Sequence, residues 1–265
     1  MMIKSKNNFL IILLSVLLIL LSIVSVSAVG ESYSWYCVHR KDNKQPIADS
    51  RFNFIDSYDC YYIDNNHGDD CEDKVVYLTF DVGYENGNVK KVLDVLKQEN
   101  VKGAFFVLGN VVEKNIDLIL QMFDDGHLVC NHTYSHKTMI GKNREEFAND
   151  LGKLEGVCLE KTGRSIAKYY RPPEGRFDEE SLKHAKELGY KTVFWSFGYA
   201  DWDNNNQMSP ERAKQKIIEN IHNGEIMLLH PTSATNAQIL GDVIREIKSK
   251  GYRFGTLNEL GGEIQ

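Results

Sequence analysis

Strand-like and helix-like segments alternate along the chain from residue 74 to residue 256, and no other feature constrains the fold as strongly. In the first unit, a β-branched and aromatic run at 75–80 is followed at 89–99 by a segment with apolar residues at helical spacing. Repeated units of this kind fold into a parallel sheet wrapped by helices. The alternation therefore predicts an α/β protein, built as a distorted or incomplete (β/α) barrel of about seven strands.

The element boundaries follow from the same pattern. The predicted strands cover residues 75–80, 103–108, 127–130, 168–171, 191–196, 224–230 and 252–256. The predicted helices cover residues 89–99, 115–125, 144–162, 179–188, 209–223 and 236–250. The helices at 115–125, 144–162 and 179–188 are closed by Gly126, Gly163 and Gly189, because glycine readily adopts the left-handed conformation that ends a helix. Over this chain length, so many strands fit one barrel better than two separate sheets.

The first residues have the composition of an export signal. Lys4 and Lys6 precede an apolar run from residue 9 to residue 24, and small residues follow up to Ala28. A basic start, an apolar middle and a small-residue end predict a secretory signal at 1–28 that is cleaved after Ala28. The segment 9–29 is also nearly long enough to span a bilayer, so a membrane anchor is the alternative. Both interpretations place the rest of the chain outside the cytoplasm.

Two regions follow the signal. Residues 29–72 are polar and rich in aromatic residues, and we expect them to form an N-terminal extension that packs on the barrel. Residues 73–262 form the barrel domain itself. The formal net charge of -6 is not offset by any basic block, which argues against a nucleic-acid partner.

The cysteines suggest few covalent constraints. All five follow the signal, and an odd number leaves at least one thiol unpaired. Cys37, Cys60 and Cys71 leave room for one disulfide, whereas Cys130 and Cys158 lie in apolar segments typical of a core. No CxxC spacing occurs, so a cysteine zinc site is not expected.

Side chains with catalytic chemistry follow the predicted strands at the points where the strands end. In chain order they are Asp81, His132 with His136, Arg171, Asp201 and His230. The carboxyl ends of parallel strands meet at one face of a barrel, which is where active sites of such barrels lie. A carboxylate together with two imidazoles four residues apart indicates metal-assisted hydrolysis.

The motifs around these residues identify a family. They are Thr79-Phe80-Asp81-x-Gly83, His132-Thr133-x-x-His136, Arg171-Pro172-Pro173-x-Gly175, Asp201-Trp202 and Leu228-Leu229-His230. In order, spacing and strand-end context they resemble the polysaccharide deacetylase family, the NodB-homology or carbohydrate esterase 4 group, across roughly residues 73 to 260. The resemblance makes 73–262 the catalytic domain. The stretches at 84–87 and 201–205 resemble the subgroup that deacetylates muramic acid in spore-cortex peptidoglycan before muramic δ-lactam formation.

The resemblance implies a catalytic role for each of the charged residues in these motifs. Amide hydrolysis needs an activated water, a stabilised oxyanion and a proton for the departing amine. Asp81 would be the general base, and His230 the general acid. Arg171, followed by two rigid prolines, would orient Asp81 and keep it ionised by charge pairing. Asp201 would orient His230 and favour its charged form.

The remaining roles concern the metal and the substrate. A divalent metal, with zinc as the first choice, would bind His132 and His136 and polarise both the water and the carbonyl. The family resemblance also implies that the backbone N–H of Glu174 helps to hold the oxyanion. Trp202 and Leu228 would line a pocket for the acetyl methyl group.

The chain departs from the family pattern at Val82, where relatives carry a second aspartate that is the third protein ligand to the metal. Valine cannot coordinate. Disturbing even an outer partner of a ligand costs roughly 10–100-fold in metal affinity, so we expect the metal to bind weakly. Three interpretations stay open: water or substrate oxygen fills the vacancy, Glu85 substitutes as ligand, or the barrel has lost catalysis and kept glycan binding.

A second departure is Gly198, where many relatives carry an acidic residue. A glycine there predicts a wider groove, which would suit the lactyl ether that distinguishes muramic acid from glucosamine.

The sequence thus predicts an exported hydrolase that acts on peptidoglycan glycan strands and removes the N-acetyl group of N-acetylmuramic acid. The first alternative is deacetylation of N-acetylglucosamine in peptidoglycan or chitin-like oligomers. The second alternative is a catalytically inactive glycan-binding barrel. The predicted location is the cell wall or the forespore intermembrane space, with the protein secreted or tethered through residues 9–29.

Overall fold

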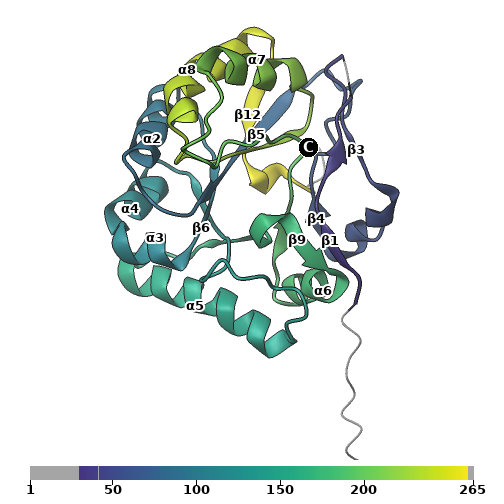
Figure 1. The fold of residues 1–265 in the computed structure, drawn as a ribbon, viewed down its shortest axis with the longest axis vertical. Coiled ribbons are helices and arrows are strands. Elements are labelled where there is room, and N and C mark those ends of the chain that lie inside the picture. The colour runs from purple at the N-terminus through teal and green to yellow at the C-terminus, as the bar shows by residue number, and fades with distance from the viewer. Residues whose placement is uncertain (1–29, 41, 262–265) are drawn as a thin grey trace, which may run out of the picture. The chain divides into compact units, whose positions relative to one another are not determined.

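A curled sheet of parallel strands forms the centre of the protein (Figure 1). The computed structural model describes residues 30–40 and 42–261, so the predicted signal or anchor at 1–28 lies outside the described residues. The strands of this sheet are β4 (Cys60–Tyr61), β5 (Val75–Val82), β6 (Ala104–Val107), β7 (Leu128–Asn131), β8 (Ala167–Tyr170), β10 (Lys191–Val193), β11 (Glu225–Leu229) and β12 (Arg253–Gly255). Their order is β11-β5-β6-β7-β8-β10-β4, with β12 paired to the start of β5.

The two ends of this sheet approach each other. Just beyond β10, Ser196 N–H donates to the carbonyl of Ile226 at 3.0 Å, and Leu228 N–H donates to the carbonyl of Phe197 at 2.8 Å. These bonds bring the continuation of β10 beside β11, so the sheet curls into a partly closed barrel. The prediction of a distorted or incomplete (β/α) barrel is confirmed.

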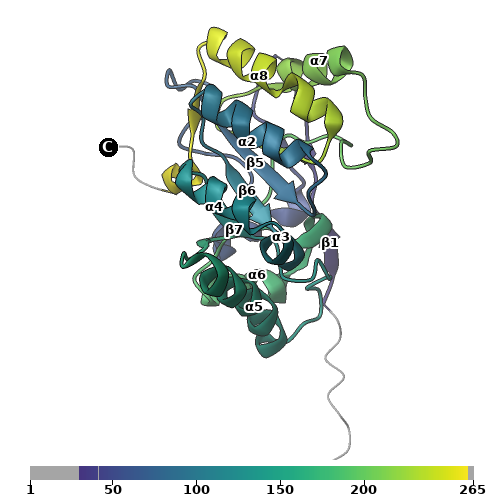
Figure 2. The same cartoon turned by 90° about the vertical axis from the view of Figure 1, so that its left-hand side faces the viewer.

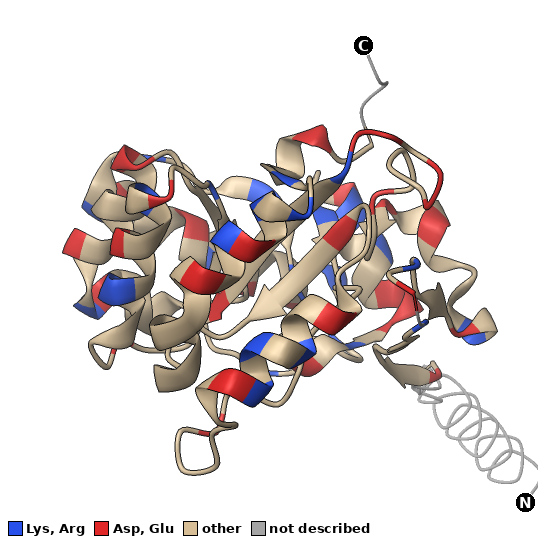
Figure 3. Cartoon of the chain, turned by 90° about the horizontal axis from the view of Figure 1, so that it is seen from above, with Lys and Arg blue, Asp and Glu red and all other residues tan. Residues whose placement is uncertain are grey.

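Helices cover the outside of the sheet, and Figure 2 shows α2, α4 and α8 lying over it. The helices are α2 (Asn88–Gln98), α3 (Gly109–Lys114), α4 (Ile116–Asp124), α5 (Arg144–Thr162), α6 (Glu179–Glu187), α7 (Pro210–Asn220) and α8 (Ala234–Ser249). Helix α5 has the predicted bounds because the Asn143–Glu146 capping box starts it and Gly163, at φ 70°, ends it. Acidic and basic residues are interspersed on the outer helices (Figure 3).

Strand β5 separates two environments. All of its residues are buried. Val76, Leu78, Phe80 and Val82 belong to the large apolar cluster that includes residues of α2, α4 and α8. The intervening residues point to the barrel interior, because successive side chains of a strand alternate between its faces. Asp81 therefore faces the barrel interior, while the next residue, Val82, packs into the apolar layer under the helices.

The N-terminal extension contributes strands of its own. β1 (Ser32–Ser34) pairs antiparallel with β9 (Arg176–Asp178), and β2 (Cys37–Val38) pairs with β3 (Ile47–Ala48). Strand β4, also from the extension, joins the edge of the main sheet beside β10. Residues from Ser32 onward form one compact unit that contains both the extension and the barrel. Short 3-10 turns at Ser50–Phe52, Ile55–Tyr58, Pro173–Gly175 and Leu257–Glu259 complete the described elements.

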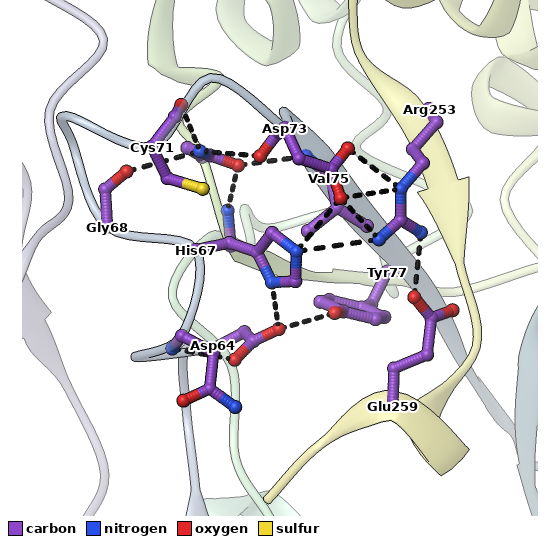
Figure 4. A network of polar contacts seen from close by, with 12 residues as sticks. Asp64, His67, Gly68, Cys71, Asp73, Val75, Tyr77, Arg253 and Glu259 are labelled. Carbon is purple, nitrogen blue, oxygen red and sulfur yellow. Dashed lines mark hydrogen bonds and ion pairs between the residues drawn. The ribbon is translucent and has the colours of Figure 1, made fainter. Parts of the chain in front are cut away.

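A polar network, buried at Asp64, His67 and Tyr77 and half-exposed at Asp73 and Arg253, connects the extension to the last strand (Figure 4). The ring of His67 lies between two carboxylates, with Nδ1 2.7 Å from Oδ2 of Asp64 and Nε2 3.1 Å from Oδ2 of Asp73. The hydroxyl of Tyr77 donates to Asp64 at 2.5 Å. Arg253 of β12 donates to Asp73 at 2.9 Å. The network lies at the amino-terminal end of β5, opposite the end that carries Asp81.

All five cysteines lie within the described residues, and all are free thiols. The disulfide that Cys37, Cys60 and Cys71 left room for is therefore not formed. Cys37 and Cys60 instead pack into an apolar cluster around the extension. Cys130 and Cys158 are buried in the core, as predicted. Among residues 30–40 and 42–261, no helix is long and apolar enough to cross a membrane.

Candidate active site

A pocket of about 640 Å³ lies at the carboxyl ends of the parallel strands. Its lining residues are Asp81, Gly83, Tyr84, Leu108, His132, His136, Glu174, Gly175, Trp195, Trp202, Leu228, His230 and Thr232. Every predicted site residue is among them except Arg171 and Asp201, which contact lining residues from behind. The size suits a small ligand or one or two sugar rings.

Arg171 fixes Asp81 from the barrel interior. Its guanidinium is fully buried and donates from Nη1 to Oδ1 of Asp81 at 2.8 Å and from Nη2 to Oγ1 of Thr79 at 2.9 Å. It also donates to the carbonyls of Val193 and Phe194, at 2.9 and 3.1 Å. Burial is the largest single influence and raises the pKa of Asp81, but the charges of Arg171, His132 and His230 and the hydrogen bond from Arg171 together outweigh it, so the pKa lies below its usual value. Asp81 is thus a buried but ionised carboxylate.

A strained turn brings the two metal-binding candidates together. Thr133 and His136 both have positive φ, 71° and 55°, and His136 N–H donates to Oγ1 of Thr133 at 2.9 Å. The rings of His132 and His136 lie 5.0 Å apart. Positive φ is uncommon for residues with a Cβ and is frequent at functional sites.

The tautomer of His132 follows from its partners. Nδ1 lies 2.9 Å from the carbonyl of Arg171, which can only accept, so Nδ1 carries the proton. Burial lowers the pKa of His132 to about 4, so the ring is neutral at pH 7. Its unprotonated Nε2 then faces Oδ2 of Asp81 at 3.5 Å. Two acceptors that face each other favour a cation or a water molecule between them.

The surroundings of His230 raise its pKa, whereas those of His132 lower the pKa of that ring. Its Nδ1 lies 2.7 Å from Oδ1 of Asp201, and its backbone N–H donates to Oδ2 of the same carboxylate at 2.8 Å. Asn236, in the first turn of α8, also donates to Oδ2, at 2.6 Å. Burial is the largest single influence and lowers the pKa of His230, but the hydrogen bond to Asp201 and the charges of Asp201 and Asp81 together outweigh it, so the pKa lies above its usual value. His230 therefore favours its charged form.

The Pro172–Gly175 turn forms another wall of the pocket. Glu174 has φ 57° and Gly175 has φ 64°, so two consecutive residues adopt the left-handed conformation. A Cβ on Gly175 would lie only 2.7 Å from the ring of Trp195, so the turn requires glycine there. The backbone N–H of Glu174 belongs to this conformation, and the resemblance assigns it to the oxyanion.

The residues present do not complete the metal site that the resemblance implies. The two imidazoles are suitably paired, but the side chain of Val82 is fully buried in the apolar layer. The carboxylate of Glu85 accepts from Gly87 N–H at 2.6 Å, and Glu85 does not line the pocket. Over the part of the chain that the structure describes, no group of three His, Cys, Asp or Glu side chains is placed to hold a metal ion. Of the three open interpretations, substitution by Glu85 is thus not supported.

Sequence reasoning missed several lining residues. Trp195 is the largest of them, and it was assigned to the interior of a predicted strand at 191–196 rather than to its end. The strand ends at Val193, so the rule that site residues follow strands would have identified Trp195. Tyr84, 47% exposed, was also missed. It lines the pocket together with the predicted Trp202, which is 61% exposed, and exposed aromatic rings of this kind can stack on sugars. Asn236 was missed because the predicted helix began there.

Comparisons with known proteins indicate the same family as the residues of the site. A family profile described as "Polysaccharide deacetylase" matches residues 68–193. The chain is 39% identical over 232 residues to peptidoglycan-N-acetylmuramic acid deacetylase PdaA of Bacillus subtilis (strain 168), covering 87% of this chain and 86% of that protein. A solved structure of B. subtilis PdaA, a family 4 carbohydrate esterase, superposes with a TM-score of 0.82 at 38% identity, covering 87% of this chain and 97% of that one.

Two other similarities bear on the alternatives. A peptidoglycan-N-acetylglucosamine deacetylase of Bacillus cereus (strain ATCC 14579) is 36% identical over 186 residues, covering 69% of this chain and 66% of that protein. The structure of a carbohydrate esterase 4 pseudoenzyme from Bacillus anthracis superposes with a TM-score of 0.68 at 28% identity, covering 77% of this chain and 69% of that one.

Proposed function

Because the chain belongs to the polysaccharide deacetylase family of amide-bond hydrolases, we propose that it removes the N-acetyl group from N-acetylmuramic acid in peptidoglycan. One observation carries this proposal. Asp81 and His230 line the same pocket, and each is held by a buried partner that moves its pKa in a different direction. Two titratable groups whose pKa values are pushed apart provide a base and an acid.

The proposed reaction uses these residues in sequence. Asp81 accepts a proton from water as its oxygen attacks the acetyl carbonyl carbon. The resulting oxyanion is stabilised by the backbone N–H of Glu174. His230 donates its proton to the sugar nitrogen as the C–N bond breaks, which releases acetate and a free amine. Arg171 and Asp201 act as positioning residues behind the base and the acid.

Deacetylases of this family are generally metal-dependent, and this chain retains two of the side chains that a metal would use. We propose that a divalent cation, with zinc as the first candidate, binds weakly to His132 and His136. When bound, it would polarise the attacking water and the acetyl carbonyl.

The choice of muramic acid rests on two features. The relative with 39% identity over most of its length is named for that sugar. In addition, a Cβ at Gly198 would lie only 3.2 Å from the ring of Trp195 and 3.6 Å from Leu228, so a larger side chain at position 198 would press on two residues that line the pocket. We propose that glycine at this position keeps that wall of the pocket from being displaced inward, which would suit a lactyl group. N-acetylglucosamine is the second candidate, supported by the B. cereus relative.

We also propose an extracytoplasmic location, because peptidoglycan lies outside the membrane. Residues 9–29 would direct the chain there, as a cleaved signal or as a tether. The finer assignment, spore-cortex peptidoglycan before muramic δ-lactam formation, rests on the subgroup motifs at 84–87 and 201–205.

The test is to incubate the purified protein with peptidoglycan, with and without added zinc, and to measure acetyl loss from each sugar by mass spectrometry. We expect loss from muramic acid, and a rate about 10²–10⁴-fold lower for Asp81→Asn. Asp94→Asn, an exposed carboxylate on α2, is the matched control and should keep the wild-type rate. Loss only from glucosamine would establish the second candidate. Glycan binding without acetyl loss under any metal would establish the inactive barrel.

A further inference from the structure

The turn that carries the Glu174 N–H is held from outside the catalytic barrel, by the N-terminal extension. The backbone N–H of Trp35 donates to the carbonyl of Gly175 at 2.8 Å. This bond continues the antiparallel pairing of β1 with β9, whose first partners are Ser34 and Arg176. The backbone from Gly175 to Asp178, where the chain leaves the turn, is therefore paired with the extension.

The side chain of Trp35 contacts a second wall of the pocket. Its indole Nε1–H donates to the carbonyl of Trp195 at 2.8 Å. The ring of Trp195 in turn lies against Gly175, where an added Cβ would meet it at 2.7 Å and would meet Cβ of Trp35 at 3.2 Å. Trp35, Gly175 and Trp195 are thus in mutual contact, with Trp35 on the side away from the pocket.

The same indole packs beneath the strand that supports Arg171. It stacks on the ring of Phe194, with centroids 4.5 Å apart and planes 18° apart. The carbonyl of Phe194 accepts from Nη2 of Arg171 at 3.1 Å. Trp35 is only 6% exposed and lies among Phe52, Phe177 and other apolar residues, so its ring has little freedom to move.

From these contacts we propose that Trp35 is a positioning residue for the oxyanion turn, and that the extension is therefore a functional part of the active site. The left-handed conformation of Glu174 is strained, and strained residues keep their geometry only where the surroundings over-determine it. Two prolines restrain the turn on one side, and Trp35 supplies the restraint on the other. This inference rests on the proposed function in one respect only, namely that the group stabilised by the Glu174 N–H is the oxyanion of amide hydrolysis.

The test is Trp35→Phe, which keeps a buried ring and the backbone N–H but removes the indole donor to Trp195. Ile55→Val is the matched control, because Ile55 is buried in the same apolar cluster. A misplaced oxyanion donor acts in the transition state, so kcat should fall and KM should stay unchanged. We expect a fall of about 10-fold or more, below the 10²–10³-fold that loss of a whole donor causes. The pH profile should not move, because Asp81 and His230 keep their partners.

A second measurement is independent of activity. Amide hydrogen exchange of the peptide spanning 172–177, followed by mass spectrometry, should be faster in Trp35→Phe than in the wild type or in Ile55→Val. Unchanged exchange in that peptide overturns the inference, as does a fall in kcat that Ile55→Val reproduces. If the wild type removes no acetyl groups, the proposed function fails, while the exchange experiment still decides whether Trp35 holds the turn.

Discussion

Replacing Arg171 by glutamine removes the group on which the electrostatics of the site depend. The guanidinium is fully buried and donates to four different residues, among them Asp81 at 2.8 Å. Glutamine is shorter and neutral, so Asp81 keeps its burial and loses the charge that compensates for it. The variant therefore separates the effect of the charge from that of the carboxylate.

The substitution should have two measurable effects, a loss of stability and a shift of the pH profile of kcat/KM. Removing one partner of a buried ion pair costs about 3–5 kcal/mol of the free energy of unfolding. At about 2–4 °C per kcal/mol for a domain of this size, the melting temperature should fall by roughly 6–20 °C. An opposite charge at this distance lowers a carboxyl pKa by about 1–3 units, so the acid limb of the kcat/KM profile should move up by a similar amount.

The sign of the pH effect on stability is also fixed. A carboxylate whose folded pKa is lowered stabilises the fold above its unfolded pKa, and this contribution is lost as pH falls through the folded pKa. In the variant, burial alone raises the pKa of Asp81, so protonation relieves the buried charge. The stability difference between wild type and Arg171→Gln should therefore be largest near pH 7, and it should narrow as pH falls from the raised pKa of Asp81 in the variant to its lowered pKa in the wild type.

The assay combines thermal unfolding at several pH values with the pH dependence of kcat/KM on peptidoglycan. Arg164→Gln is the control, because Arg164 is a half-exposed arginine whose ion pair with Asp124 should contribute no more than about 1 kcal/mol. An acid limb that stays in place in Arg171→Gln would refute the assignment of Asp81 as the base that Arg171 keeps ionised. A variant as stable as the control would refute the energetic argument.

Three further predictions concern the acid, the metal and the sugar. Asp201→Asn removes the negative charge that, through a charge-assisted hydrogen bond, raises the pKa of His230, so the alkaline limb of kcat/KM should move to lower pH; an unmoved limb contradicts this role. Val82→Asp should lower the melting temperature without zinc, because it buries a carboxylate in the apolar layer. Added zinc should restore the melting temperature, and calorimetry should show at least about 10-fold tighter zinc binding; equal affinity contradicts the ligand argument. Gly198→Asp should press on Trp195 and reduce muramic acid turnover, and unchanged turnover would sink the proposal of a wider groove.

The fold and most of the pocket could be predicted because both follow local rules. Strand β5 is a run of buried apolar residues that ends in Asp81, and helix α5 carries its own start and stop signals at Asn143 and Gly163. The strand-end rule then gathers side chains that are far apart in the sequence, such as Asp81 and His230, without any knowledge of their distances.

What could not be predicted depends on long-range packing. The extension was expected to lie on the barrel, but nothing in its sequence indicates that β4 pairs with β10 or that Trp35 reaches Gly175. Likewise, Val82 was recognised as a missing ligand, whereas its place in the apolar layer follows from the alternation of β5. Sequence pattern specifies which face of an element is buried and leaves open which distant segment covers it.

The network around His67 has a consequence for how the protein folds. Arg253, which binds Asp73 at 2.9 Å, follows it by 180 residues, so this contact closes nearly the whole length of the domain. Contacts of such long sequence separation form late and slow folding, because the loop between them must first lose its entropy. Because the chain is synthesised from its amino terminus, residues 64–73 can form these contacts only after strand β12 has been synthesised. Folding of this domain should be completed only after residue 253 has left the ribosome, and a chain truncated before residue 253 should have an extension that is more sensitive to proteolysis.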